Sequence, residues 1–311
     1  MALVARGPTP AEVVRKSLQG RRLDARGLLF QGGLLLSLIT SLLLLVVLLA
    51  DVVRKSMAVF ADRGMEFLAG RLTVVTASTA GVGQGLTGSL LTLLFVVLVA
   101  IPVGVGAAVY LEEYAPNTRL NRFITVNIRN LAGVPSIVYG LLGLAVFVEV
   151  AGQVTGGKSV ITGGLTLAVL VLPIVIITAS EALRAVPDSI REAGFGVGAT
   201  RWEVIRSHVL PSAAPGILTG TILSLSRAVG ETAPLLLVGA VTGLLATGDA
   251  GFTEQLFGRY TTLPTIVYRW ARLPQDDFRV LTAAAIVVLL GLTLSANAIA
   301  ILLRNRYERK W

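Results

Sequence analysis

Six long apolar stretches dominate the sequence and constrain its fold more than any other feature. They cover residues 27–50, 72–111, 130–148, 159–180, 209–248 and 280–303. Each is about as long as, or longer than, the roughly 20 helical residues that cross the hydrocarbon core of a bilayer. Charged residues make up 14% of the chain, whereas a typical soluble domain has roughly 25%. We therefore expect an integral membrane protein.

The chemistry of the bilayer predicts the secondary structure of these stretches. Lipid tails offer no hydrogen-bond partner, so an open β-strand would leave its backbone groups unpaired, whereas a helix pairs them internally. We therefore expect an all-α protein with six transmembrane helices. Residues 1–26 are expected to form a cytoplasmic N-terminal arm, residues 27–303 one membrane domain, and residues 304–311 a cytoplasmic tail.

The distribution of Lys and Arg predicts the orientation of the chain. If the N-terminus is cytoplasmic, the cytoplasmic segments carry 17 basic residues, the opposite side carries nine, and one lies within a span. Basic residues favour the cytoplasmic side of a membrane. Both termini and the segment 181–211 are therefore expected there. The net charge of +9 is typical of the basic cytoplasmic loops of a membrane protein. We expect membrane lipid, and no nucleic acid, as a partner.

The residue types that most enzymes need are scarce in this chain. It has no cysteine and a single histidine, His208. These counts exclude a thiolate nucleophile and a metal site built from several Cys or His residues. We therefore expect no catalytic residues, no metal site and no cofactor bound by this chain itself.

The cytoplasmic segment 181–211 contains the most informative motif. Gly198 permits a sharp turn, and a short helix can follow it with Thr200 as the N-cap. We expect this helix to present Trp202 and Ile205 on one face. The segment resembles the EAA loop of ABC-importer permeases. The spacing agrees at Glu192, Ala193, Gly198, Leu210 and Pro211.

The resemblance implies that this segment is a coupling helix that fits a groove of a cytoplasmic ATPase. Glu192 would then orient the loop by pairing with a basic partner, and Gly198 would set the turn. Gly194 and His208 stand where the motif has Ala and Ile. The alternative is an ordinary cytoplasmic loop with a partly buried Trp202, since an exposed Trp usually belongs to a core or an interface.

The fifth apolar stretch contains two charged residues, Arg227 and Glu231, whose spacing places both on one face of a helix. A charge at this depth costs at least about 2.5–3.5 kcal/mol, and such residues usually face a polar cavity. Arg suits phosphate or sulfate because its guanidinium donates two parallel hydrogen bonds. The pair predicts an anion pathway in which Glu231 holds Arg227. An internal salt bridge that fixes helix packing is the alternative.

The stretch from Arg227 through Thr232 to Leu235 resembles the R-A-x-G-E-T-A-P-L signature of phosphate-specific ABC permeases, the PstA type. Residues 101–116 resemble the helix-two ending of that family, and residues 130–141 resemble its helix-three opening. The likeness is continuous over about residues 80–240. It implies the type I ABC-importer permease fold and a role as permease subunit of an ATP-driven phosphate importer in the bacterial plasma membrane.

The resemblance also implies the partners and the site. The partners would be a second permease of the PstC type, a dimeric ATP-binding subunit of the PstB type and an extracellular phosphate-binding protein of the PstS type. ATP and Mg would be bound by the ATPase. Arg227, Glu231 and Thr232 would line the substrate pathway, and Arg129 is a further candidate. A positive-inside anchor is the simpler interpretation of Arg129.

Two other kinds of transporter remain compatible with the sequence. The Arg–Glu pair alone does not distinguish phosphate from molybdate, sulfate or another oxyanion. A secondary anion transporter would typically carry inverted repeats and several intramembrane acids, whereas Glu231 is the one acidic residue deep in a stretch. A requirement for a separate ATPase distinguishes these classes.

Overall fold

The computed structural model describes residues 25–240 and 252–307. The expected N-terminal arm lies outside these ranges except for its last two residues, and the last four residues of the expected tail also lie outside. All regular secondary structure in the described ranges is helical. Five helices are long and apolar enough to cross a membrane, or six if one bent pair counts as a span. The predicted all-α membrane fold is confirmed.

The chain divides into two compact units, residues 1–51 and 52–311. The described part of the first unit belongs to helix α2, Ala25–Ala69, in which residues 26–48 are all exposed. A helix that is apolar on all sides is suited to lipid. The predicted first span, 27–50, is therefore helical throughout. Within the second unit, α2 has a kink at Gly64, where φ is 40°.

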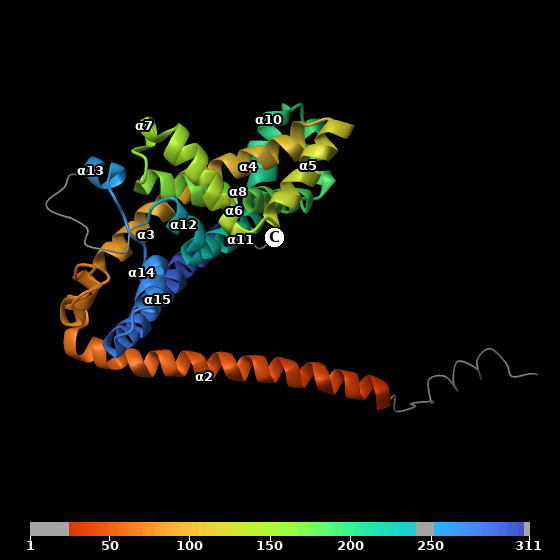
Figure 1. Ribbon diagram of the computed structural model, residues 1–311. Helices are drawn as coiled ribbons and strands as arrows, with labels where there is room; N and C mark the ends of the chain where they lie inside the picture. The colour runs from red at the N-terminus through yellow and green to blue at the C-terminus, as the bar shows by residue number, and fades with distance from the viewer. Residues whose placement is uncertain (1–24, 241–251, 308–311) are drawn as a thin grey trace, which may run out of the picture. The chain divides into compact units, whose positions relative to one another are not determined.

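The second unit contains the remaining helices (Figure 1). In chain order its elements after α2 are η1 (Ala77–Thr79), α3 (Gly83–Phe95), η2 (Val96–Ala100), α4 (Ile101–Val109), η3 (Tyr110–Tyr114), α5 (Arg119–Ala132), α6 (Ser136–Gly143), η4 (Leu144–Val150), α7 (Gly152–Thr155), α8 (Val160–Arg184), α9 (Asp188–Gly196), α10 (Arg201–Val204), η5 (Ile205–Val209), α11 (Leu210–Gly230), α12 (Ala233–Leu237), α13 (Phe252–Phe257), α14 (Leu263–Trp270) and α15 (Asp276–Tyr307). The elements η2 to η5 are π-helical turns that connect helices without a break or extend their ends.

The second and fifth predicted spans have different bounds in the structure. The second begins at Gly83 rather than at residue 72, and continues as one helix to Tyr114. The fifth begins at Arg201 and ends at Gly230, so the prediction of a single span over 209–248 is wrong. Its residues from 241 onward lie outside the described ranges.

The third predicted span, 130–148, is broken in the structure. Helix α5 ends at Ala132, α6 begins at Ser136, and the two helical segments are bent by 103°. Pro135 accounts for the break, because proline has no backbone N–H to continue the helix and disfavours helical geometry in the residue before it. A continuous third helix is therefore wrong.

Helix α8 lies at the centre of the second unit, in contact with α3, α4, α5, α6 and α11 (Figure 1). Close approach depends on small residues. A Cβ atom on Gly104 of α4 would lie 2.6 Å from a methyl group of Val175, and one on Gly216 of α11 would lie 2.7 Å from the Cβ of Ala182. Small residues that let backbones approach are the usual means of helix association in lipid.

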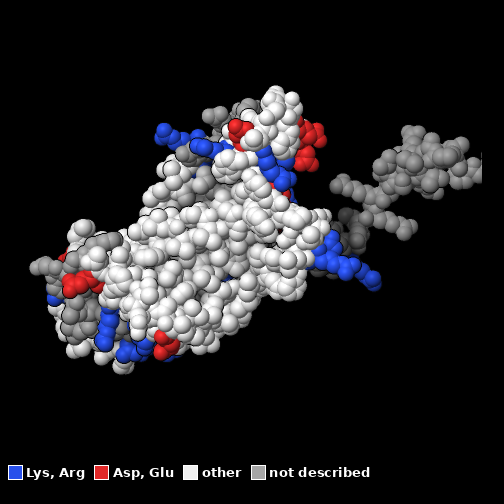
Figure 2. Space-filling model, turned by 90° about the horizontal axis from the view of Figure 1, so that it is seen from above, with Lys and Arg blue, Asp and Glu red and all other residues white. Residues whose placement is uncertain are grey.

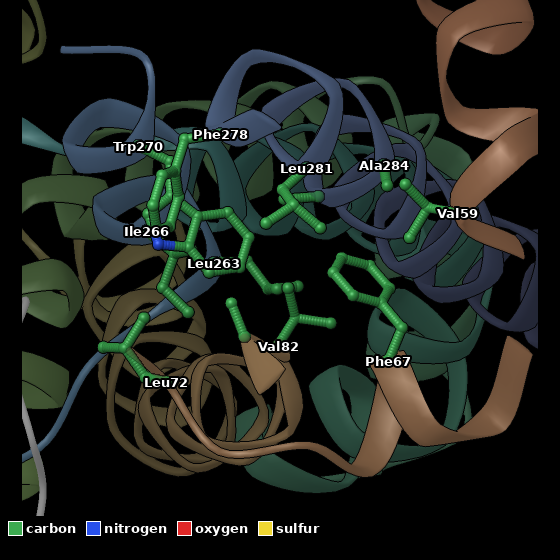
Figure 3. Packing of buried hydrophobic residues seen from close by; sticks show 12 residues of the cluster. Val59, Phe67, Leu72, Val82, Leu263, Ile266, Trp270, Phe278, Leu281 and Ala284 are labelled. Carbon is green, nitrogen blue, oxygen red and sulfur yellow. The ribbon is translucent and has the colours of Figure 1, made fainter. Parts of the chain in front are cut away.

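A separate aromatic cluster joins the end of α2 to α14 and α15 (Figure 3). The ring of Trp270 lies between Phe67 and Phe278, with centroid distances of 6.4 and 6.0 Å. Its indole N–H donates a hydrogen bond to the carbonyl of Thr73 at 3.0 Å. All three rings are at most 1% exposed. The cluster therefore fixes α14 against the end of α2 and α15.

The surface agrees with a membrane environment. Figure 2 shows a broad area of one face without charged side chains, and Lys, Arg, Asp and Glu lie at its margins. Apolar side chains are exposed on several helices, for example Leu98 at 62% and Leu294 at 65%. In water such an area would favour aggregation, whereas lipid tails solvate it.

Gly88 of α3 offers a test of this packing. A Cβ atom there would collide with the backbone carbonyl of Thr261, whereas one on Gly106 of α4 would meet no atom within 4 Å. We expect Gly88→Ala to destabilise the protein by about 1–3 kcal/mol, the usual cost of overpacking. Gly106→Ala should leave stability unchanged or slightly higher. Thermal unfolding in detergent measures both, and equal melting temperatures would contradict this packing.

Candidate functional site

The segment between α8 and α11 folds largely as its motif predicts. Helix α9 is followed by a turn in which Gly198 has a φ of 84°, a conformation that suits glycine. Thr200 is the N-cap of α10, and its hydroxyl accepts a hydrogen bond from the N–H of Glu203 at 3.4 Å. The Glu203 carboxylate accepts from the N–H of Thr200 at 2.7 Å. This capping box pairs two backbone donors that the helix leaves free.

Two details of the predicted segment are wrong. Helix α10 does not end before the membrane, since it continues through η5 into α11 as one helix from Arg201 to Gly230. Leu210 and Pro211 therefore form the first turn of α11 within this helix. Trp202 and Ile205 are not presented together at the surface, because Trp202 is 53% exposed while Ile205 is 1% exposed and packs in a buried cluster.

Several apolar side chains around this turn are exposed. Phe195 is 48%, Val197 85% and Trp202 53% exposed, and Glu192 and Ala193 are also exposed. We call residues 185–209 the coupling segment. Its exposed apolar residues are unusual in a segment that the charge pattern places in water, and they suit a partner surface.

Gly194 of the motif lies between the two short helices of the segment. It is buried, and a Cβ atom on it would lie 2.7 Å from a methyl group of Val204. This contact explains why glycine stands where the motif has alanine, because the two short helices α9 and α10 approach each other here.

Arg227 and Glu231 form an ion pair, but not on one continuous helix. Helix α11 ends at Gly230, and Glu231 has extended backbone angles of −73° and 129°. The Nε atom of Arg227 lies 3.3 Å from Oε1 of Glu231, and the two side chains are 40% and 16% exposed. Among the described residues, only Nε of the guanidinium has a partner. Within the described part of the chain, its two Nη groups have no hydrogen-bond partner.

The pair lies where two broken helices meet. Helix α11 ends before Glu231, and α12 begins after Thr232. Helix α12 packs closely on α6, because a Cβ atom on Gly140 would lie 2.7 Å from the Cα atom of Pro234. The hydroxyl of Tyr139 in α6 donates to the carbonyl of Leu131 at 2.8 Å, across the break between α5 and α6. Polar groups of the pathway of a transporter are commonly held at such discontinuous helices.

The structure does not bring all the predicted pathway residues together. Arg227, Glu231 and Thr232 are adjacent at the end of α11. Arg129 lies instead in another hollow, between α5 and the C-terminal part of α8, whose lining includes Ser180 and Arg184. Arg129 is thus not part of the site formed by the charged pair.

The sequence motif does not reveal the residues that hold the coupling segment in place. Glu112 and Glu113 at the end of η3 bind Arg184 and Arg191. Hydrogen bonding to the Glu113 carboxylate raises the pKa of Arg191 above its usual value. Two features of the sequence could have indicated this contact. Arg191 stands directly before the motif, and two carboxylates stand at the end of a span.

A bundle of membrane-crossing helices with a charged pair at a helix break has the architecture of a membrane transport component. Residues 100–309 match the family described as binding-protein-dependent transport system inner membrane component. The chain belongs to this family. It is therefore a multi-pass permease component of the plasma membrane.

The chain is also similar in sequence to individual transport permeases. The phosphate transport system permease protein PstA of Xylella fastidiosa (strain Temecula1 / ATCC 700964) is 32% identical over 238 residues, 76% of this chain and 79% of that protein. PstA 1 of Mycobacterium tuberculosis (strain CDC 1551 / Oshkosh) is 34% identical over 220 residues, 70% and 69%. The probable ABC transporter permease protein YqgI of Bacillus subtilis is 38% identical over 178 residues, 57% and 58%.

Solved structures share the fold. A chain of the inward-facing methionine ABC transporter MetNI has a TM-score of 0.55 at 20% identity, covering 74% of this chain and 95% of that chain. A chain of a bacterial ABC transporter involved in import of the polysaccharide alginate has a TM-score of 0.54 at 12% identity, covering 89% and 99%. The fold is that of a type I ABC-importer permease, as the sequence predicted.

The capping box can be tested by removing the hydroxyl of Thr200. Thr200→Ala should weaken the start of α10 by about 1 kcal/mol, the usual value of an N-cap. Hydrogen exchange in residues 201–205 should then be about fivefold faster. Thr219→Ala is the matched control, because that hydroxyl bonds only the Pro215 carbonyl in its own helix. Equal protection in wild type and Thr200→Ala would contradict the capping role.

Proposed function

We propose that this chain is a permease subunit of an ATP-driven phosphate importer and forms half of its translocation pathway. The sequence identity to proteins named phosphate transport system permease protein PstA, over most of the chain, carries this proposal. Its partners would be a second permease of the PstC type, an ATPase dimer of the PstB type that binds ATP and Mg, and an extracellular phosphate-binding protein of the PstS type. The chain itself would catalyse no reaction.

The charged pair supports an anion pathway. Arg227 is 40% exposed and has one of its donor groups on Glu231, so the other donors can bind a phosphate with two parallel hydrogen bonds. Glu231 reduces the net positive charge, which favours the weak binding that transport requires. Thr232 lies at the same break and can offer its hydroxyl to the anion. Arg129 lines a different hollow and is not part of the proposed anion site.

One continuous helix links this pair to the coupling segment. The helix from Arg201 to Gly230 carries Trp202 near one end and Arg227 near the other. At about 1.5 Å per residue these side chains are about 38 Å apart along the helix axis. Both termini and the coupling segment are placed on the cytoplasmic side in this proposal. ATPase closure against Trp202 would then displace the helix that holds the anion site.

The anion pathway is tested by Arg227→Gln. The glutamine keeps a polar side chain but lacks the positive charge and the paired N–H donors of the guanidinium. We expect loss of ATP-dependent phosphate uptake by at least about 100-fold, since removing a charge-assisted contact costs several kcal/mol. Assembly should be unchanged. Arg279→Gln is the matched control, because Arg279 pairs with Asp276 at 3.2 Å but is 70% exposed. Normal uptake by the Arg227 variant would contradict the pathway.

The coupling surface is tested by Trp202→Ala. A buried Trp anchor at an interface is typically worth at least about 2 kcal/mol, so binding of the ATPase to the permease should weaken by about 30-fold. Affinity of the purified ATPase for permease in nanodiscs measures this. Phe257→Ala removes an aromatic ring of similar exposure, 49%, far along the chain. An equal effect of both variants would argue against a specific coupling surface.

A further inference from the structure

Arg191, in helix α9 of the coupling segment, makes an unusually large number of hydrogen bonds through its guanidinium. Its Nη2 donates to Oε1 of Glu113 at 2.8 Å and to the carbonyl of Leu183 at 3.0 Å. Its Nη1 donates to the carbonyl of Val186 at 2.8 Å and to Asp188 at 3.2 Å. The Arg191 side chain is 18% exposed and that of Glu113 is 9% exposed. Nearly all the hydrogen-bond donors of the Arg191 guanidinium therefore have partners.

These contacts connect three parts of the chain. Glu113 lies in the last turn of the helix that runs from Gly83 to Tyr114. Leu183 and Val186 belong to the last turn of α8 and the residues after it, where backbone carbonyls lack partners within the helix. Arg191 itself belongs to α9 of the coupling segment. The guanidinium therefore joins α9 to both helices at the same point.

Two further contacts reach the same short element, η3. Arg184 forms a bidentate pair with Glu112 at 2.7 and 2.8 Å. The guanidinium of Arg201 lies 5.4 Å from the ring centre of Tyr114. Arg184 is 52% exposed, and exposed ion pairs contribute little because water screens them. The better-buried pair of Arg191 and Glu113 is therefore the principal polar link.

We propose that Arg191 and Glu113 are positioning residues that make the coupling segment move together with the helix Gly83–Tyr114. This inference rests on the proposed function, in which an ATPase displaces the coupling segment. The chain already connects that segment to α8 and α11. Val204 and Ile205 of the segment also share a buried cluster with Ala108 and Val109 of the helix Gly83–Tyr114. The ion pair adds a direct link from α9 to that helix. Without the pair, α9 can rotate at Pro187 and Gly198 while the helix Gly83–Tyr114 stays in place.

Glu113→Gln tests the link, because it keeps the shape of the side chain and removes the charge. In the reconstituted complex we measure ATP hydrolysis and phosphate uptake together. Phosphate transported per ATP hydrolysed should fall about fivefold or more, the lower range of coupling between sites, while hydrolysis continues. Arg191→Lys keeps the charge, but an ammonium group cannot make all the hydrogen bonds of the guanidinium. The phosphate transported per ATP should therefore fall less than in Glu113→Gln. Asp276→Asn breaks an ion pair whose Asp side chain is 88% exposed and should leave the ratio unchanged.

A distance measurement tests the link without relying on transport. The chain has no cysteine, so spin labels can be placed at Ser189→Cys in α9 and Val103→Cys in α4, both exposed. In the complex, wild type should give one narrow distance distribution, and Glu113→Gln a clearly broader one. An unchanged transport ratio or an unchanged distribution in Glu113→Gln would overturn the proposal. If the wild-type complex takes up no phosphate but the distribution broadens, the proposed function fails and the mechanical link stands.

Discussion

Every backbone N–H and C=O in the hydrocarbon core must find a partner within the protein, and the architecture depends on this constraint. Helices satisfy it by default, so a break needs support from neighbouring groups. The break between α5 and α6 is bridged by the Tyr139 hydroxyl on the Leu131 carbonyl. The break after Gly230 is covered by α12 packed on α6. The charged pair lies at this second break, where an interrupted helix leaves room for polar groups.

The helix from Arg201 to Gly230 connects the two functional regions. Its first turn is fixed by the capping box of Thr200 and its buried Ile205, which leave Trp202 exposed. Its other end carries Arg227. A rigid helix transmits an axial or tilting displacement over its full length, so in the proposed function a partner that moves one end also moves Arg227 at the other. The Arg191–Glu113 pair extends this unit to a further span.

The sequence predicted the class of fold, the turn at Gly198, the Thr200 cap and the proximity of Arg227 to Glu231. These depend on local rules of hydropathy, capping and spacing. It did not predict the break at Pro135, because the apolar stretch is continuous through it. Nor did it predict that Glu231 lies beyond the helix, or that Arg191 binds Glu113, a residue 78 positions away. Such contacts depend on tertiary packing, which periodicity in one segment does not encode.

Uptake of labelled phosphate into vesicles that contain the complete complex is the most direct test of the central claim. The account predicts uptake that requires both internal ATP and the ATPase subunits, and that excess unlabelled phosphate inhibits far more strongly than sulfate or molybdate. Uptake of another oxyanion in place of phosphate would contradict the assigned cargo. Uptake by this chain without any ATPase would contradict the importer assignment itself.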